Sequence, residues 1–162
     1  MSHTAPRISP VRFHCEEILR VPRRDVFDGL VCLEKWKSFR GYGPLPGIRE
    51  ANFLLRNEEI TGSIIRVEST DGSVHQERFL EWLPEERVVI ELSGFSHPLS
   101  VFAVRFVEEW SFIPDGDTSR VRRSVELFPV NEYTRPVLWL ISLLLRRAIS
   151  SHLKGVASGI GL

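Results

Sequence analysis

The chain has 162 residues, 43% of them hydrophobic and 26% charged, which is the composition of one folded globular domain. Lys plus Arg and Asp plus Glu number 21 each, so the formal net charge is zero. This balance argues against nucleic acid as a partner, because phosphate binding needs a positive excess. We expect a flexible lead-in at residues 1–10, a single domain at 11–155 and a tail at 156–162.

Two cysteines, Cys15 and Cys32, are too few for a disulfide framework or a zinc site, and we expect free thiols. Residues 1–10 lack the apolar core of a signal peptide, and the longest apolar stretch, 137–145, is far shorter than the roughly 20 residues of a membrane span. We therefore expect a cytoplasmic protein without a transmembrane segment. The five histidines show no metal-ligand spacing, so no metal and no cofactor is expected.

The first predicted elements are one strand and two short helices. Residues 11–20 are rich in β-branched and aromatic side chains and predict a strand. Pro22 then suits the first turn of a helix, in which Val26, Phe27 and Leu30 follow at helical spacing. A second short helix is predicted over 33–39.

From Ile48 onward the hydrophobic period is two for about 80 residues. Strands are predicted near 48–56, 63–70, 73–82, 88–95, 101–112 and 118–129, and Asp71-Gly72 between two of them is a strong hairpin signal. A final helix is predicted over 132–154, with Pro136 in its first turns and Gly155 as its stop. The order predicts an α+β fold: a curved seven-stranded antiparallel sheet wrapped around a long C-terminal helix, with two short helices between the first two strands.

Several segments carry a resemblance to a known superfamily. They are the segment 22–30 (PRRDVFDGL) ahead of 33–36 (LEKW), the loop 43–47 (GPLPG), the hairpin segments 70–73 (TDGS) and 109–114 (EWSFIP), and the last helix with Ala148, His152 and Leu153. Over residues 11–155 the chain resembles the START-like helix-grip superfamily (SRPBCC), which includes polyketide cyclase/dehydrase and lipid-transport proteins and the birch-pollen allergen group. The resemblance implies a cavity for a lipid, sterol, quinone or polyketide-like ligand between sheet and helix.

The last hairpin supplies the polar part of the predicted cavity. If Trp110 pairs with Val121, then Phe106 meets Val125 and Glu108 lies opposite Arg123 on the apolar face. This pair could orient the carboxylate or hydroxyl of a ligand, or form a salt bridge at the rim. The predicted cavity residues are Phe102, Phe106, Glu108, Trp110, Val121, Arg123, Val125, Ile141 and Leu145, with Pro44, Leu45 and Pro46 as a gate at the mouth.

His75 and Glu77 share one face of a predicted strand and are candidates for proton transfer if that face points inward. The opposite orientation stays open, because Val74, Leu80, Trp82, Val88, Ile90 and Leu92 form the more apolar set of that hairpin. Glu91 and Glu108 are further candidates for proton transfer. If any of these four groups faces the ligand, the alternative function is that of a cyclase or dehydratase acting on a polyketide-like substrate.

The last helix is apolar over more than one face. Val137, Ile141, Leu144 or Leu145, Ala148 and His152 form the predicted inward stripe, whereas Leu138, Trp139, Leu140 and Leu143 lie outside it. A deep groove, a second subunit or membrane lipid could cover these residues. We predict a module that binds a small hydrophobic ligand, with a homodimer through this helix as one further possibility and recruitment of another protein through Trp139 as another.

Overall fold

A computed structural model describes residues 8–160 of the chain. Its seven strands form one antiparallel sheet in the order β1-β7-β6-β5-β4-β3-β2. The strands are β1 (Val11–Leu19), β2 (Ile48–Leu55), β3 (Ile64–Ser69), β4 (Val74–Leu83), β5 (Arg87–Ser93), β6 (Ala103–Asp115) and β7 (Thr118–Pro129). The predicted fold class is confirmed.

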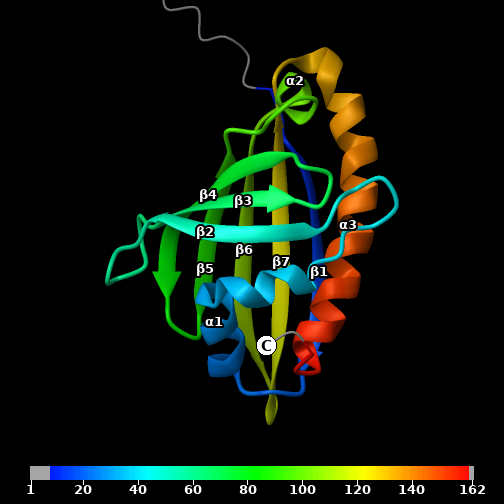
Figure 1. The fold of residues 1–162 in the computed structure, drawn as a ribbon. Coiled ribbons are helices and arrows are strands. Elements are labelled where there is room, and N and C mark those ends of the chain that lie inside the picture. The colour runs from blue at the N-terminus through cyan, green and yellow to red at the C-terminus, as the bar shows by residue number, and fades with distance from the viewer. Residues whose placement is uncertain (1–7, 161–162) are drawn as a thin grey trace, which may run out of the picture.

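The sheet curves strongly around a central space. In Figure 1, β5, β6 and β7 run along the long axis of the molecule, whereas β2 and β3 cross in front of them. The long helix α3 (Arg135–Ala157) lies along one side and packs against β1, where the backbone N–H of Arg20 donates to the carbonyl of Ala157 at 2.8 Å. The helix and the curved sheet thus enclose the concave face.

Short helical segments close the two ends of this space. Helix α1 (Arg23–Val31) follows Pro22 and buries Val26, Phe27 and Leu30, and the 3₁₀ turn η1 (Leu33–Ser38) follows it. At the other end, α2 (Leu99–Phe102) occupies the start of the segment predicted as strand 101–112. The turn η2 (Glu132–Thr134) then leads into α3.

The start of helix α3 has identifiable signals. The side chain of Asn131 accepts a hydrogen bond from the backbone of Thr134 at 3.0 Å and so caps η2, which leads into α3, and Pro136 stands in the first turn of α3. The helix was predicted to stop at Gly155, but it continues to Ala157. Val156 and Ala157, assigned from the sequence to the tail, are buried. Residues 1–7 of the predicted lead-in and the last two residues of the tail lie outside the described residues.

The register of the last hairpin differs from the prediction by two residues. The chain turns at Gly116-Asp117, with Gly116 at a φ of 58°, so Asp115 pairs with Thr118. Trp110 consequently pairs with Arg123 rather than Val121, and Glu108 with Val125. Because the shift is even, every side chain stays on its predicted face, and the long Arg123 side chain still reaches Glu108 diagonally.

A bulge in β4 settles the orientation that the sequence left open. The pairing with β5 shifts between Phe79 and Glu81, so the inward face changes from odd to even residues at this point. His75, Glu77 and Phe79 point inward before the bulge, and Trp82 packs against Phe79 after it, with ring centroids 5.6 Å apart. Leu80, which the alternating pattern places with the apolar set, is exposed.

Candidate functional site

A cavity of about 420 Å³ lies between the concave face of the sheet, α3 and the loop 40–47. Its size falls within the range of small-molecule sites, and its walls are mostly aliphatic and aromatic. Of the residues predicted from the sequence, it is lined by Phe102, Phe106, Glu108, Trp110, Arg123, Val125, Ile141 and Leu145, and at the loop by Pro44, Leu45 and Pro46. Val121 is not among the lining residues: it pairs with Phe112 and is fully buried.

Glu108 and Arg123 form a bidentate ion pair that lines this cavity. Arg123 Nε lies 2.8 Å from Glu108 Oε1, and Nη2 lies 3.0 Å from Oε2. Trp110 Nε1 also donates to Glu108 Oε1, and the Arg123 guanidinium lies 4.6 Å from the centre of the Trp110 ring. Both charged side chains are about 10% exposed, so this pairing offsets the cost of burying them.

Another donor of Arg123 links this ion pair to α3 and η1. Arg123 Nη1 lies 3.2 Å from His152 Nδ1, and His152 Nε2 lies 3.0 Å from Ser38 Oγ. Because arginine can only donate, Nδ1 is the acceptor and the ring proton sits on Nε2. Burial and the charge of Arg123 lower the pKa of His152 to about 3, so the ring is neutral at pH 7.

This chain of hydrogen bonds bears on the two roles left open for the Glu108–Arg123 pair, a ligand handle or a salt bridge. The two side chains form the salt bridge, three Arg123 donors are engaged, and the Arg123 charge is balanced by Glu108. Ser38 and the aromatic lining residues Trp36 and Phe39 were not predicted as site residues. The spacing that predicts a helix over 33–39 does not show what its aromatic side chains meet.

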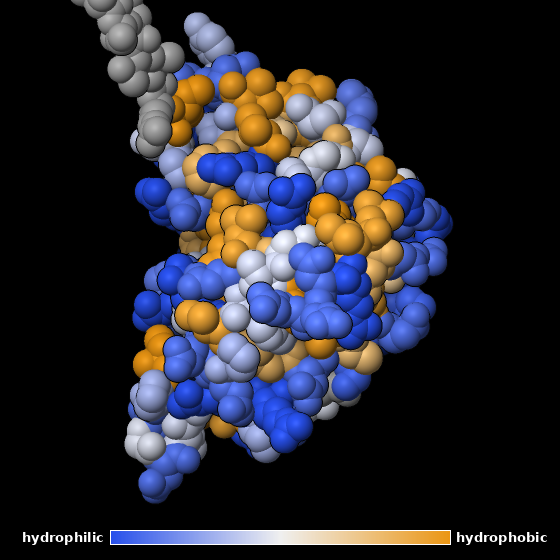
Figure 2. Space-filling model, turned by 90° about the vertical axis from the view of Figure 1, so that its left-hand side faces the viewer, coloured by the Kyte–Doolittle hydropathy of each residue, from blue (hydrophilic) through white to orange (hydrophobic). Residues whose placement is uncertain are grey.

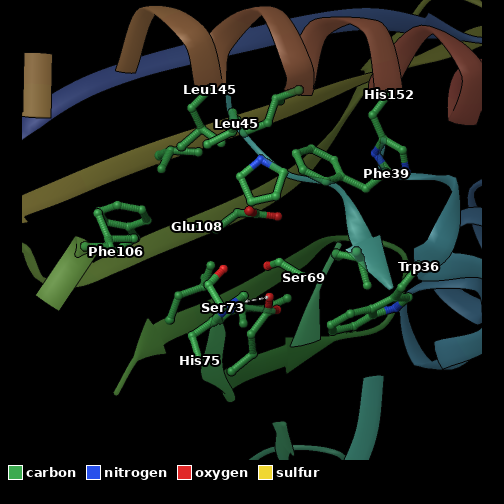
Figure 3. A pocket seen from close by; sticks show the side chains of 18 of the residues that line it. Trp36, Phe39, Leu45, Ser69, Ser73, His75, Phe106, Glu108, Leu145 and His152 are labelled. Carbon is green, nitrogen blue, oxygen red and sulfur yellow. Dashed lines mark hydrogen bonds and ion pairs between the residues drawn. The ribbon is translucent and has the colours of Figure 1, made fainter. Parts of the chain in front are cut away.

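His75 and Glu77 form a second polar cluster on the opposite wall. Figure 3 shows His75 with Ser69 and Ser73 on the side of β3 and β4, across from Phe39 and His152. His75 Nε2 lies 3.0 Å from Glu77 Oε1, and the ring lies against Phe95 with centroids 5.9 Å apart. Glu91, the third candidate for proton transfer, instead pairs with Arg105 at 3.0 Å and does not line the cavity.

The loop 40–47, whose Pro44, Leu45 and Pro46 line the cavity, is held in place by hydrogen bonds. Tyr42 and Leu45 exchange two backbone hydrogen bonds at 3.0 Å, and a Cβ at Gly41 would clash with the Leu45 carbonyl oxygen. On the outer side, Arg147 of α3 donates to the Tyr42 hydroxyl at 2.9 Å and lies over its ring. This contact ties the loop to α3.

Part of the apolar surface of α3 contacts neither the sheet nor the cavity. Leu138 and Leu153 are fully buried, Ile141, Leu144, Leu145 and Ile149 line the cavity, and Trp139, Leu140 and Leu143 are 53%, 57% and 43% exposed. Exposed apolar side chains also occur elsewhere, as the orange patches between blue ones in Figure 2 show. No helix within residues 8–160 is long and apolar enough to cross a membrane.

Comparisons with known proteins show the fold. No family model matches the sequence, and the search of curated proteins gives no match. Among solved structures, a START superfamily protein from Mycobacterium smegmatis superposes with a TM-score of 0.68 at 11% identity, covering 90% of this chain and 96% of that one. The structure of Ara h 8.0201 gives 0.65 at 13% identity, covering 91% and 97%.

A third similar structure comes from a biosynthetic context. DynU16, described as a putative protein in the dynemicin biosynthetic locus, gives a TM-score of 0.56 at 12% identity and covers 88% of this chain but 47% of that one. At these identities the likeness concerns the fold. The chain has the START-like helix-grip fold.

Proposed function

We propose that this protein binds one small hydrophobic or amphipathic molecule in the cavity between the sheet and α3. The observation that carries the proposal is the cavity itself, apolar over most of its wall and polar at two separate points. A lipid, sterol, quinone or polyketide-like compound fits this description. The apolar wall supplies affinity at about 25 cal/mol per Å² of ligand surface removed from water, before the costs of association.

The test is native mass spectrometry of freshly purified protein, followed by extraction and identification of what it carries. Leu145→Trp, which fills the cavity, should abolish the bound mass, whereas Leu140→Trp, on the exposed face of the same helix, should leave it unchanged. An empty wild-type protein that also fails to bind a panel of neutral hydrophobic probes would contradict the proposal.

A second candidate function rests on the His75–Glu77 hydrogen bond. An imidazole held by a carboxylate inside a ligand cavity is an arrangement for proton transfer, and a cyclase or dehydratase of polyketide-like compounds would use it. Conversion of a poly-β-ketone by the wild type, lost in His75→Phe and retained in His14→Phe on the outer face of β1, would support this function. Equal rates in all three proteins would end it.

Two further parts of the proposal concern the setting of the protein. Cys15 and Cys32 are both free thiols, which suits a reducing compartment such as the cytoplasm. For the exposed residues Trp139, Leu140 and Leu143 we propose a second copy of the chain as the cover, since aromatic and aliphatic side chains form the centres of such interfaces.

A further inference from the structure

The acceptors of the α3-side wall are mostly satisfied by donors of the same wall. Glu108 Oε1 accepts from Trp110 and Arg123, Oε2 accepts a second bond from Arg123, and both ring nitrogens of His152 are engaged. What this wall still offers is mainly donors: two Arg123 N–H groups that make no hydrogen bond within residues 8–160, and the Ser38 hydroxyl, which accepts from His152 and keeps its own proton. The Glu108 carboxylate uses three of its roughly four acceptor sites, and its charge and that of Arg123 balance each other.

Glu77, on the opposite wall, differs from Glu108 in this respect. The residue is 8% exposed, yet the only hydrogen bond of its side chain within residues 8–160 joins Oε1 to His75. No fully buried side-chain oxygen in this part of the chain lacks a partner, so Oε2 must border open space. Because Glu77 lines the cavity, that space is the cavity.

A carboxylate oxygen removed from bulk water and left without a donor is costly, and a ligand can relieve this cost by donating to it. A hydroxyl or phenol group does so without adding charge. A ligand carboxylate would place a second negative charge beside Glu77 and would leave the oxygen unpaired. The chemistry of the wall therefore discriminates between these two kinds of amphiphile.

We propose that the cavity selects an uncharged amphipathic molecule whose hydroxyl or phenol group donates to Glu77 Oε2, and that it rejects carboxylates such as fatty acids. This inference rests on the proposed binding function. Glu77 pairs with Leu92 on β5 and Leu92 with Phe106 on β6, so Glu108 lies two strands across and two residues along, roughly 12 Å away in an unbent sheet. A ligand of about that length spans the two walls, and an uncharged acceptor such as a ketone at its far end meets the donors of the α3 side.

Lys35 is the one lining cation outside the Glu108–Arg123 pair. It lies on η1, is only partly buried and has no ion-pair partner within the described residues. A long lysine side chain of this kind keeps its ammonium group in water, at the rim rather than in the interior. It offers a carboxylate a site distinct from Glu77, and the experiment must separate the two.

The experiment is calorimetric titration of the full chain at pH 8 with three probes of one shape: naphthol, methoxynaphthalene and naphthoate. The wild type should bind naphthol about tenfold more tightly than methoxynaphthalene, the gain of one hydrogen bond to a charged acceptor, and naphthoate most weakly. Glu77→Leu should abolish the preference for naphthol over methoxynaphthalene. Glu77→Gln, which still accepts a hydrogen bond but carries no charge, should mainly improve naphthoate binding.

Glu109→Leu, which removes a carboxylate paired with Arg87 on the outer face, is the matched control and should change none of the three affinities. Equal affinities for the three probes, or naphthoate as the tightest, would overturn the inference while leaving the binding function intact. If naphthoate binds the wild type and this binding disappears in Lys35→Met, the naphthoate carboxylate lies at the rim. The cavity would then accept a carboxylate, which would also overturn the inference and leave the binding function intact. Failure of all three probes to bind the wild type would count against the binding function itself.

Discussion

His152 is held neutral by its surroundings, and this has a consequence for stability. Its pKa falls from 6.5 in the unfolded chain to about 3 in the folded protein, because the ring is buried and Nδ1 faces Arg123. Between these two values the unfolded state binds a proton that the folded state does not. The stabilisation is therefore complete above pH 6.5 and is lost as the pH falls toward 3.

We expect this group to contribute a slope of about 1.4 kcal/mol per pH unit to the free energy of unfolding between pH 4 and pH 6. His152→Asn should remove that part of the slope, as measured by urea denaturation at a series of pH values. His14→Asn, at an exposed position on β1, serves as the control and should keep the slope of the wild type. A wild-type slope in the His152 variant would show that the ring takes up its proton in the folded state.

The Glu108–Arg123 pair makes a second prediction at this scale. Arg123→Met leaves a buried carboxylate with only the Trp110 N–H as donor, and we expect a loss of about 3–5 kcal/mol in the free energy of unfolding. The double variant Glu108→Leu/Arg123→Met should recover most of it, because no buried charge then lacks a partner. Denaturant unfolding measures both effects.

An exposed ion pair on the outer face calibrates this comparison. Arg87 pairs with Glu109 at 2.9 Å, but Arg87 is 46% exposed, so Arg87→Met should cost less than about 1 kcal/mol. If Arg123→Met were as mild as Arg87→Met, water or a neighbouring group must compensate Glu108, and the pair would not be buried in the sense described above.

At the scale of elements, the contact between Arg147 of α3 and Tyr42 of the loop 40–47 should slow the release of a bound ligand. The bond between Arg147 and the Tyr42 hydroxyl, with the guanidinium over the ring, holds the loop that carries Pro44, Leu45 and Pro46. Arg147→Ala should raise the dissociation rate of a bound hydrophobic probe about two- to tenfold, the worth of one exposed hydrogen bond. Stopped-flow fluorescence after mixing with a competitor measures this rate.

Two further variants isolate the contact. Tyr42→Phe keeps the ring under the guanidinium but loses the hydroxyl, so its rate should lie between those of the wild type and Arg147→Ala. Arg146→Ala removes an exposed arginine whose side chain makes no hydrogen bond or ion pair with the loop among the described residues, and should leave the rate unchanged. An increase as large in Arg146→Ala would assign the effect to the charge of α3 rather than to the loop.

The elements themselves were largely predictable, whereas their detailed pairing was not. Asp71-Gly72, Pro136 and the period of two mark the strands and the last helix through local preferences that tertiary contacts did not override. The β6–β7 register depended on the length of the turn between the strands. The sequence 114–117 (PDGD) permits either a four-residue turn, as predicted, or the observed two-residue turn at Gly116-Asp117. The bulge after Phe79 left no local signal, so the inward orientation of His75 stayed open.

At the scale of the whole molecule, the candidate site depends on contacts between distant segments. Arg123, His152 and Ser38 come from β7, α3 and η1, and the spacing along the chain gives no reason to join them. The hydrophobic pattern predicted which residues face inward, and therefore most of the cavity wall. It also suggested the Glu108–Arg123 pair, but not that His152 and Ser38 extend this pair to α3 and η1.

The exposed face of α3 bears on the assembly of the molecule. If a second copy covers Trp139, Leu140 and Leu143, the protein should sediment as a dimer at micromolar concentration, and Trp139→Asp should yield a monomer with an unchanged fold.

Leu54→Asp, at a position on β2 that is 56% exposed, is the control, since it places the same charge on an apolar site away from α3. Analytical ultracentrifugation separates the outcomes. A wild type that remains monomeric at 100 μM, a concentration at which an interface of about 800 Å² per partner is formed in most complexes, would show that this face is not a homodimer contact.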